Sequence, residues 1–274
     1  MFNYHTHTHF CDGSSAPEAY VTEAIRLGFN TLGFSGHAPV PFENHYAIPA
    51  EKLADYCTEI RRLKSLYAGK IQLLLSLEID CIPGSMPTHL HFTETCGLDY
   101  TIGSIHLVQH PVTGGLWFID GHKQETWDNG LHEVMNDDIQ MGVSLYYKQL
   151  QQMVVEDAPT IIGHLDKIKM HNRNRFFNED EKWYDRLLTE TLEIISQSNC
   201  IVEINTRGIY KKRSLDLFPS AKVVKKMKAM GIPVTISSDA HDPAELPLLF
   251  DETFRLIAET GYKPDEYMGL QIFR

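Results

Sequence analysis

The chain has 274 residues, enough for one large domain with a substantial core or for two small ones. Apolar residues make up 43% and charged residues 22%, and no Gly/Pro-rich tract, acidic tail or repeat indicates a linker, a disordered region or a solenoid. The formal net charge of -11 disfavours nucleic acids and anionic membranes as partners, because both attract clustered Lys and Arg. A single domain over residues 1–274 is therefore expected.

Short apolar, β-prone runs alternate with helical patterns along the chain. The predicted strands are residues 2–6, 31–35, 71–79, 99–104, 160–163, 200–205 and 232–236. The predicted helices are residues 17–27, 50–67, 131–156, 179–198, 219–230 and 243–260. Strands that alternate with helices, some of them apolar on both faces, indicate a mainly parallel sheet. The expected fold is α/β, a barrel of βα units.

Two stretches interrupt this alternation. Residues 38–49 are rich in proline, whereas residues 105–130 are aromatic and rich in turn formers, so both are predicted as loops. Loops of this size in a compact domain usually cover a functional site.

The cysteines are dispersed and have no CxxC spacing: Cys11, Cys57, Cys81, Cys96 and Cys200. This pattern argues against a disulfide framework and against a thiolate zinc site, and it fits a reducing cytoplasm. The first residues resemble no secretion signal, and no apolar run approaches the roughly 20 residues of a membrane span. We therefore expect a cytoplasmic protein without a membrane anchor.

His5 and His7 stand on alternate positions of the first predicted strand. Side chains two residues apart on a strand point the same way, so both imidazoles can reach one cation. A chance pair of surface histidines fits this short motif equally well. The choice between the two interpretations depends on the other strands.

Histidines and carboxylates also stand at the carboxyl ends of later predicted strands. They are His37 in GFSGH, Glu78 in LSLEID, His106 in GSIH, His164 in IIGHLD, and Asp239 and His241 in SSDAH. In a βα barrel these ends converge on one face, where active sites are built. A hydrogen-bonded core histidine would explain any one of these residues, but not the whole set.

Asp12, which follows the first strand, brings the candidate metal ligands to nine together with His5 and His7. Imidazole and carboxylate ligands without thiolate suit Zn, Fe(II) or Mn. Nine ligands exceed the needs of one tetrahedral centre. More than one metal ion is therefore expected.

The pattern resembles the polymerase and histidinol phosphatase (PHP) family of metallohydrolases. The segments that carry the resemblance follow the family's order over essentially the whole chain: HTHTHFCDG, GFSGH, LEID, GSIH, IGHLDKIK, EINTRG and SSDAH. The chain is most similar to the histidinol-phosphatase branch. The resemblance implies a distorted (β/α)7 TIM-like barrel with a trinuclear metal site. It also implies a metal-dependent phosphomonoesterase that hydrolyses L-histidinol phosphate to L-histidinol and phosphate in histidine biosynthesis.

The resemblance further implies how the ligands divide among two or three divalent ions of Zn, Fe or Mn. The first ion would be held by His5, His7, Glu78 and Asp239, the second by Glu78, His106 and His164, and the third by Asp12, His37 and His241. Glu78 would bridge the first two ions. His9 has no counterpart among the family's ligands, and we expect it to lie beside the site without binding a metal.

Clustered divalent cations lower the pKa of a bridging water from about 16 toward neutrality and neutralise the oxygens of a phosphate ester. Such a site suits phosphomonoester hydrolysis, which is very slow without a catalyst. The cations would also let an acidic protein bind a small anionic substrate. Asp239 or His241 could protonate the leaving alkoxide or orient the attacking water.

Arg207 in EINTRG is the expected phosphate binder, because a guanidinium can engage two phosphate oxygens at once. A surface arginine is the alternative interpretation. Arg173 and Arg175 are weaker candidates that we expect to be solvated.

The ammonium and imidazole of histidinol phosphate would need acidic and aromatic partners. The two loops contain such side chains: Phe42, Glu43 and His45 in the first, and Trp117, Phe118, Asp120 and Trp127 in the second. Of these, His45 and Asp120 are the predicted substrate-binding residues. An aromatic loop that only covers the core is equally consistent with the sequence.

Other functions stay open. An amidohydrolase also uses HxH on its first strand, but it typically adds a metal-bridging lysine that neither GSIH nor IGHL contains. A PHP phosphoesterase could act on another small phosphate ester or a nucleotide, whereas long nucleic acids would need a basic groove. A non-catalytic PHP binding module would tend to lose ligands, and this chain keeps all nine. The oligomeric state is left open.

Overall fold

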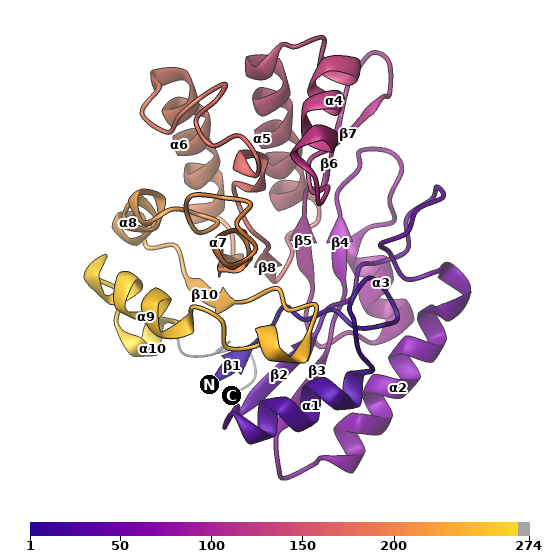
Figure 1. Ribbon diagram of the computed structural model, residues 1–274. Helices are drawn as coiled ribbons and strands as arrows, with labels where there is room; N and C mark the ends of the chain where they lie inside the picture. The colour runs from indigo at the N-terminus through magenta and orange to yellow at the C-terminus, as the bar shows by residue number, and fades with distance from the viewer. Residues whose placement is uncertain (268–274) are drawn as a thin grey trace.

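Figure 1 shows a core of short strands surrounded by helices in the computed structural model, which describes residues 1–267. The strands are β1 (Phe2–Asn3), β2 (Thr31–Phe34), β3 (Gln72–Leu75), β4 (Glu78–Asp80), β5 (Ile102–Ser104), β6 (Leu107–Gln109), β7 (Leu116–Phe118), β8 (Ile161–Ile162), β9 (Ile201–Asn205) and β10 (Val234–Ser237). The α-helices are α1 (Pro17–Arg26), α2 (Leu53–Leu66), α3 (His89–Cys96), α4 (Gln124–Met135), α5 (Ile139–Glu156), α6 (Lys182–Ser196), α7 (Arg207–Tyr210), α8 (Ala221–Ala229), α9 (Phe250–Glu259) and α10 (Pro264–Tyr267). Short 3-10 helices are η1 (Ala50–Lys52), η2 (Lys167–Lys169) and η3 (Pro243–Glu245).

The strands form two parallel sheets and one antiparallel hairpin. β1, β2 and β3 are hydrogen-bonded in that order, and the second sheet has the order β10-β9-β8-β5-β4. Leu32 lies opposite Leu73 in the first sheet, and Ile102 lies opposite Ile161 in the second. These side chains are buried, as expected for parallel strands that are covered by helices.

The ladder hydrogen bonds of residues 1–267 divide into these two sheets, and no closed barrel is formed by them. Two isolated parallel bridges join the sheets. Thr6, beyond β1, pairs with Ala240, beyond β10, and His37, beyond β2, pairs with Glu78 of β4. The first bridge lies beyond the carboxyl ends of β1 and β10, and the second joins the carboxyl end of β2 to the first residue of β4, so both connect the sheets where the metal ligands are predicted.

The prediction of one strand over residues 71–79 is wrong, because the chain changes its pairing partner midway. β3 pairs with β2, whereas β4 pairs with β5. At the break, the Ser76 carbonyl accepts a hydrogen bond from the Tyr56 hydroxyl at 2.9 Å. The side chain thus satisfies a carbonyl that leaves the strand ladder.

The prediction that residues 105–130 are a loop is also wrong, since they contain the hairpin of β6 and β7 and the start of α4. Likewise, the helix predicted over residues 131–156 is two helices. Asn136 and Asp137 have φ values of 50° and 63°, which end α4, and Asp138 then caps α5 by accepting from the Met141 N–H at 2.9 Å. The proline-rich stretch 38–49 has no helix or strand, as predicted.

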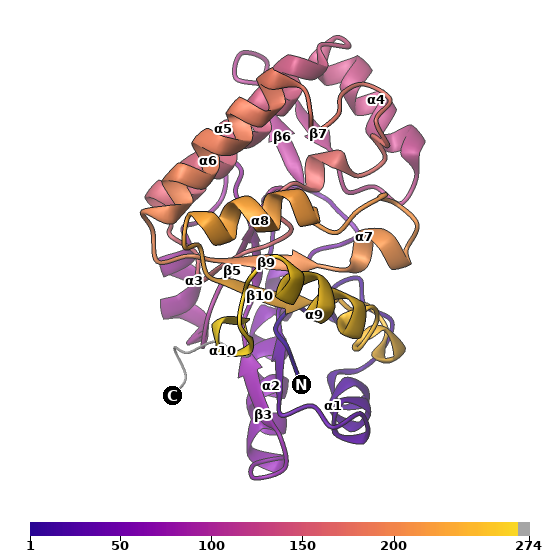
Figure 2. The same ribbon diagram turned by 90° about the vertical axis from the view of Figure 1, so that its left-hand side faces the viewer.

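Each long helix covers the sheets with one apolar face. In α6 the buried positions Tyr184, Leu188, Leu192 and Ile195 recur at helical spacing. Figure 2 shows α6 side by side with α5, with which it is in contact. In both ribbon views the β6–β7 hairpin and α4 lie at the opposite end of the molecule from β3.

Candidate metal centre

His5 and His7 follow β1 and lie buried beside the end of β10. The His7 N–H donates to the Ala240 carbonyl at 2.8 Å, and the Ala240 N–H donates to the His5 carbonyl at 3.1 Å. These hydrogen bonds hold the HxH pair against the SSDAH segment. The Nε2 atoms of His5 and His7 lie 3.1 and 3.4 Å from Glu78 Oε2. The alternating spacing therefore places both imidazoles on the same carboxylate.

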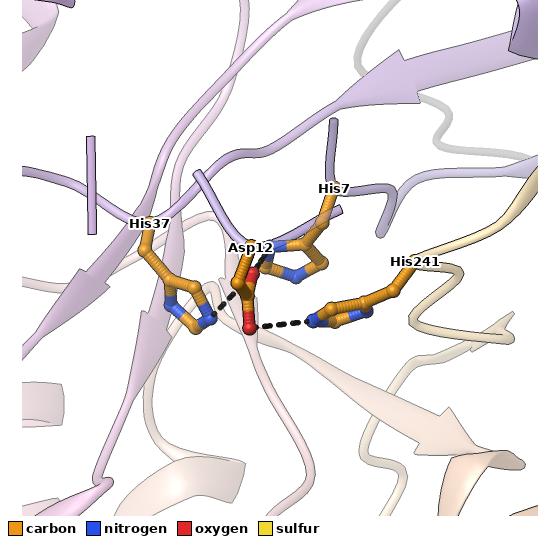
Figure 3. Close-up of side chains that lie close together, drawn as sticks. All are labelled: His7, Asp12, His37 and His241. Atoms are coloured by element: carbon orange, nitrogen blue, oxygen red, sulfur yellow. Dashed lines mark ion pairs between the residues drawn. The ribbon is translucent and has the colours of Figure 1, made fainter. Parts of the chain in front are cut away.

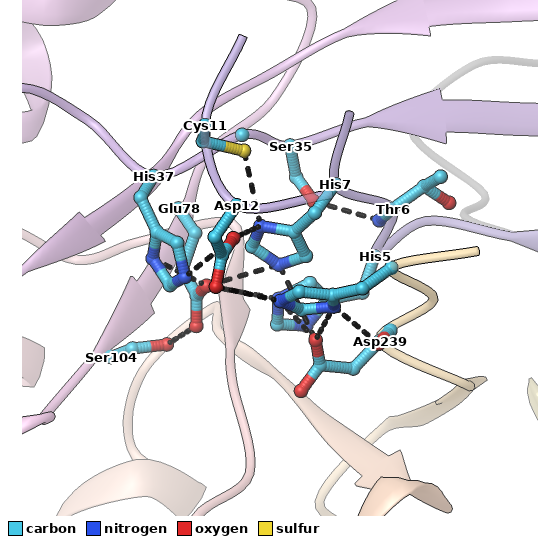
Figure 4. Close-up of polar contacts among 12 residues, drawn as sticks. His5, Thr6, His7, Cys11, Asp12, Ser35, His37, Glu78, Ser104 and Asp239 are labelled. Atoms are coloured by element: carbon cyan, nitrogen blue, oxygen red, sulfur yellow. Dashed lines mark hydrogen bonds and ion pairs between the residues drawn. The ribbon is translucent and has the colours of Figure 1, made fainter. Parts of the chain in front are cut away.

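Glu78, the first residue of β4, lies at the centre of the cluster (Figure 4). Its Oε2 lies 3.1 Å from His37 Nδ1, and its Oε1 lies 3.3 Å from His106 Nε2 and 2.9 Å from His164 Nε2. The Ser104 hydroxyl donates to Oε1 at 2.6 Å. A carboxylate with a different histidine group on each oxygen can bridge two cations.

Asp239 supplies a second buried carboxylate from the end of β10. Its Oδ1 lies 3.3 Å from His7 Nε2, 3.4 Å from His241 Nδ1 and 3.8 Å from His5 Nε2. The Asp239 backbone has a φ of 52°, a left-handed conformation that costs a non-glycine residue free energy. Arg207 Nη1 donates to the Asp239 carbonyl at 2.8 Å and helps to hold this conformation.

Asp12 lies among three histidines on the more open side of the cluster. Figure 3 shows its carboxylate between the rings of His7, His37 and His241. Asp12 Oδ2 lies 3.2 Å from His241 Nε2, and Oδ1 lies 3.7 Å from His7 Nδ1 and 3.8 Å from His37 Nε2. Asp12 is 23% exposed, whereas Glu78 is almost fully buried, so the cluster opens to solvent on the Asp12 side.

Among the described residues there are three sets of potential metal ligands, and within each set the ligand atoms lie within 4.8 Å of one another. They are His5, His7 and Asp239; His37, Glu78 and His106; and His7, Asp12, His37 and His241. His7 and His37 each belong to two sets, whereas the family resemblance assigns each of them to one ion. His164 belongs to none of the three, although its Nε2 lies 3.1 Å from His106 Nε2. The structure thus brings all nine predicted ligands into one cluster, but the sets differ from those that the resemblance implies.

Several ligand atoms of this cluster are buried without a hydrogen-bond partner: His5 Nε2, His7 Nε2, Asp12 Oδ1, His37 Nδ1 and Glu78 Oε2. A buried polar atom without a partner costs about 1–3 kcal/mol. Imidazole nitrogens and carboxylate oxygens are ligands that Zn²⁺ accepts. The donor set therefore fits divalent metal ions.

Burial and neighbouring charges set the protonation of the cluster. Burial lowers the pKa of His7 to about 4, and burial also lowers the pKa of His37. Burial by itself raises the pKa of Glu78 and of Asp239, but the nearby histidines, His5 foremost, outweigh it and hold both pKa values well below their usual range. Burial by itself lowers the pKa of His5, but neighbouring carboxylates, Glu203 foremost, outweigh it and raise the pKa well above its usual value. Burial also lowers the pKa of His106 by itself, and there neighbouring carboxylates, Asp80 foremost, raise it in the same way. Ionised carboxylates and neutral imidazoles are the forms that bind metals, so His5 and His106 would release a proton when a cation binds.

Two carboxylates behind the cluster orient its histidines. Glu203 Oε1 lies 2.7 Å from His5 Nδ1, and Asp80 Oδ1 lies 3.0 Å from His106 Nδ1. Such partners fix the tautomer and the ring orientation of a metal ligand. Sequence reasoning missed both residues. Asp80 stands two residues after Glu78, and this spacing along a strand was the signal that could have found it.

Lys167 is a buried cation beside the cluster that sequence reasoning also missed. Its Nζ lies 3.0 Å from Asp120 Oδ1 and 3.9 Å from Asp239 Oδ2, and the residue is 2% exposed. Burial by itself raises the pKa of Asp120, but the charge of Lys167 outweighs burial and brings the pKa below its usual value, so Asp120 stays ionised. The IGHLDKIK segment contains no pattern that distinguishes this buried lysine from a surface one.

A cavity of about 430 Å³ opens onto the cluster. Loop 38–49 forms part of its wall, and Asn44 shapes this loop because its Oδ1 accepts from the N–H groups of Tyr46 and Ala47 at 3.1 and 2.7 Å. The Tyr46 ring stacks on Phe118 of β7 with centroids 5.7 Å apart. The loop and the hairpin therefore form one continuous wall.

Some of the side chains predicted to contact substrate line this cavity: Phe42, Glu43, His45, Phe118 and Asp120. Trp117 and Trp127 do not line it, because both are fully buried in the core. The Trp117 Nε1–H donates to the Trp127 carbonyl at 2.9 Å, and the two rings are 4.8 Å apart. These tryptophans thus follow the alternative interpretation, in which the aromatic segment covers the core.

Of the predicted phosphate binders, only Arg207 lines the cavity. Arg175 instead forms an ion pair with Asp128 at 2.6 Å, and its side chain is 30% exposed, so it is less solvated than expected. Arg173 donates to the Lys212 carbonyl and is exposed, as expected.

His9 is exposed and lies away from the ligand sets. Its ring is 4.6 Å from the ring of Phe10, and it lines a separate surface depression with Phe10 and Pro17. The strand alternation ends after His7, because the His9 N–H donates to the Ser15 carbonyl at 2.9 Å in a turn.

Comparison with known proteins identifies the family. Residues 3–207 match the model of the PHP domain, which is more than half of the chain. This chain belongs to the PHP domain family. The matched region contains seven of the nine clustered ligands, and Asp239 and His241 lie beyond it.

Similar proteins cover nearly the whole chain. A curated PHP relative from Deinococcus radiodurans, described as a histidinol-phosphatase, is 26% identical over 265 residues, which are 94% of this chain and 92% of the relative. A structure from Listeria monocytogenes, also described as a histidinol phosphatase, has a TM-score of 0.79 at 21% identity and covers 92% of this chain and 99% of its own. The Lactococcus lactis histidinol phosphate phosphatase, solved with Zn, L-histidinol and phosphate, has a TM-score of 0.65 at 22% identity and covers 96% and 94%. These likenesses support the α/β PHP fold. Within residues 1–267, no helix has the length and apolar character needed to span a membrane.

Proposed function

We propose that this PHP protein is a metal-dependent phosphomonoesterase, a histidinol-phosphatase that hydrolyses L-histidinol phosphate to L-histidinol and phosphate. The observation that carries the proposal is the cluster of nine imidazole and carboxylate side chains at a cavity of about 430 Å³. The names of the relatives and the ligands of the Lactococcus lactis enzyme support this substrate.

Two or three divalent cations are the proposed cofactors. His5, His7, Glu78 and Asp239 would hold the first, Glu78, His106 and His164 the second, and Asp12, His37 and His241 the third. Zinc is favoured because the Lactococcus lactis enzyme contains it, and iron and manganese are the alternatives. When bound, such cations supply an activated water and neutralise phosphate oxygens.

The chain's own residues would orient the reacting groups. Asp239 and His241 stand on one segment, where His241 Nδ1 lies 3.0 Å from the Asp239 carbonyl. We assign them to orienting the attacking water or protonating the leaving alkoxide. Arg207, which Glu245 and the Asp239 carbonyl hold in place, is the proposed phosphate ligand.

The loop wall would bind the histidinol part of the substrate. Glu43 and Asp120 offer carboxylates to the ammonium group, while Phe42 and His45 offer rings to the imidazole. Asp120 is already paired with Lys167, so its position in the wall is fixed before substrate binds.

We further propose that the strands form a single-domain, distorted seven-stranded TIM-like barrel, in which β3 and β4 together take one strand position. The bridges from Thr6 to Ala240 and from His37 to Glu78 support it, since they continue the two sheets into one another. A cytoplasmic location is proposed because the substrate is a small biosynthetic intermediate.

The proposal is tested by a screen of phosphomonoesters against purified protein whose metal content has been measured. We expect L-histidinol phosphate to have the highest kcat/KM of the esters tested. Preference for a nucleotide would instead indicate another phosphoesterase of the family. If no ester releases phosphate from the metal-loaded protein, a binding module is the better interpretation.

A further inference from the structure

The cavity wall contains two guanidinium groups, those of Arg207 and Arg213. Histidinol phosphate has a single anionic group, its phosphate, so both arginines face a substrate that offers only one anion. The sequence pattern pointed first to Arg207 and more weakly to Arg173 and Arg175, but not to Arg213. The surroundings of the two side chains, however, differ in charge.

Arg207 is already neutralised by protein groups. Its Nη1 donates to Glu245 Oε2 at 3.3 Å and to the Asp239 carbonyl at 2.8 Å, and its Nε lies 4.0 Å from Asp239 Oδ2. The residue is 6% exposed. A phosphate that binds Arg207 must therefore share it with two carboxylates.

Arg213 has no direct ion pair of this kind. Its Nη2 lies 2.5 Å from His122 Nδ1, and within residues 1–267 no carboxylate oxygen comes within 4.0 Å of its guanidinium. A guanidinium has five N–H donors, so a contact with one imidazole nitrogen leaves others for a ligand. The backbone is fixed at this point, because the Arg213 N–H donates to the Gly208 carbonyl at 2.8 Å and the His171 N–H donates to the Arg213 carbonyl at 3.0 Å.

The electrostatic surroundings agree with this geometry. Burial lowers the pKa of Arg213, the carboxylate of Asp120 raises it, and the positive charge of Arg207 lowers it again. A guanidinium stays charged under such shifts, since its ordinary pKa is above 12. An anion placed between the two arginines would offset the repulsion between their charges.

We propose that Arg213 binds the phosphate group of the substrate and that His122 positions its guanidinium. This inference rests on the proposed function and assigns the phosphate to one end of the cavity, with the histidinol group toward loop 38–49. Arg213 supplies a guanidinium without a direct carboxylate partner, while Arg207 holds the Asp239 segment at the same end of the cavity.

Direct binding of inorganic phosphate tests the inference without turnover. Isothermal titration of the metal-loaded protein is expected to give a Kd for phosphate that is about tenfold to a hundredfold higher in Arg213→Ala than in the wild type. Arg213→Lys, which keeps the charge but loses the fork, should fall in between. Arg186→Ala on α6, an exposed arginine paired with Glu190, is the matched control and should bind phosphate as the wild type does.

Product inhibition separates phosphate binding from a general structural effect. In Arg213→Ala, the inhibition constant of phosphate should rise with the KM for L-histidinol phosphate, while the inhibition constant of L-histidinol stays the same. Equal weakening of both products, or an unchanged Kd for phosphate, would overturn the role of Arg213. If the wild type does not hydrolyse L-histidinol phosphate but its phosphate affinity still depends on Arg213, the proposed function fails and the anion site stands.

Discussion

Glu78 shows how a single side chain can organise the whole centre. Its two oxygens face different histidines, with His5, His7 and His37 near Oε2 and His106 and His164 near Oε1. These five histidines come from four separate segments of the chain. The sequence could predict that they meet, because each stands at a strand end, but it could not predict which oxygen each one faces. That detail depends on side-chain rotamers and on the break between β3 and β4.

The backbone conformation of Asp239 decides which substitution best tests the role of its charge. Asparagine tolerates a positive φ better than alanine does, so Asp239→Asn removes the charge with little backbone strain. We expect kcat to fall by about three orders of magnitude or more, since a metal ligand supports several kcal/mol of transition-state stabilisation. Phosphate release measures kcat, and circular dichroism shows whether the variant is folded.

Asp251→Asn, at an exposed position of α9, serves as the control for the Asp239 substitution and should keep wild-type activity. Full activity in folded Asp239→Asn would remove Asp239 from the centre.

Glu203 acts through the histidines that it holds. Its Oε1 lies 2.7 Å from His5 Nδ1, and its Oε2 accepts from the His164 N–H at 2.8 Å. Glu203→Gln should weaken metal binding by about 10-fold to 100-fold, as loss of such partners typically does. Competition with a chromophoric chelator measures this affinity, with the exposed Glu193→Gln as the control. An unchanged affinity would mean that the ring of His5 is oriented by other contacts.

At the scale of elements, the predictions succeed where hydrophobic periodicity marks a strand or helix, and they fail for a helix that is defined mainly by its caps. The strand positions at β2, β8, β9 and β10 follow from their apolar runs. Helix α3 was missed because its apolar stripe is weak, although Thr88 caps it by accepting from the His91 N–H at 3.2 Å and Gly97, with a φ of 57°, ends it. Caps of this kind are common in loops as well, so they do not predict a helix without periodicity.

The start of α3 carries an acid-sensitive group. His89 is 3% exposed, both of its ring nitrogens lack hydrogen-bond partners, and burial lowers its pKa to about 4. As the pH falls below about 6.5, the unfolded chain takes up a proton that the folded chain rejects, so stability is lost between about pH 6.5 and 4. The loss from this one group is about 3 kcal/mol at the acid end of that range.

His89→Leu should therefore flatten the decrease in unfolding free energy between pH 7 and pH 5, measured by urea titration. His91→Leu, on the same helix but exposed, should leave that decrease unchanged. Identical pH profiles for the wild type and His89→Leu would show that His89 is not a source of acid sensitivity.

Across the whole molecule, the net charge is -11, which by itself would repel an anionic substrate, so binding depends on the charges near the cavity. Arg207 and Arg213 line the cavity, and Lys167 is buried behind it against Asp120, so three cationic side chains lie beside the ligand cluster. Overall composition correctly disfavours polyanionic partners in bulk, but it does not predict local charge. A few buried residues decide that property, and they make a small contribution to any average over 274 residues.

Metal removal should lower the stability of the entire fold. Ligands come from β4 and from the segments after β1, β2, β5, β8 and β10, so bound cations would link both sheets in the native state only. Ligand at 100 times its Kd adds about 2.7 kcal/mol per site. We expect exhaustive chelation to lower Tm by several degrees and abolish turnover, and zinc to restore both. Calorimetry checks the first effect, and retention of full activity without metal would contradict metal catalysis.

The bridge between Thr6 and Ala240 has a consequence for the order of events in the cell. The HxH pair is synthesised first, but its backbone partner emerges from the ribosome more than 230 residues later. The nascent protein therefore cannot complete the ligand cluster until the segment after β10 has been synthesised and has paired with the segment after β1. A product of premature termination before residue 239 lacks Asp239 and His241, so it cannot form the complete ligand cluster.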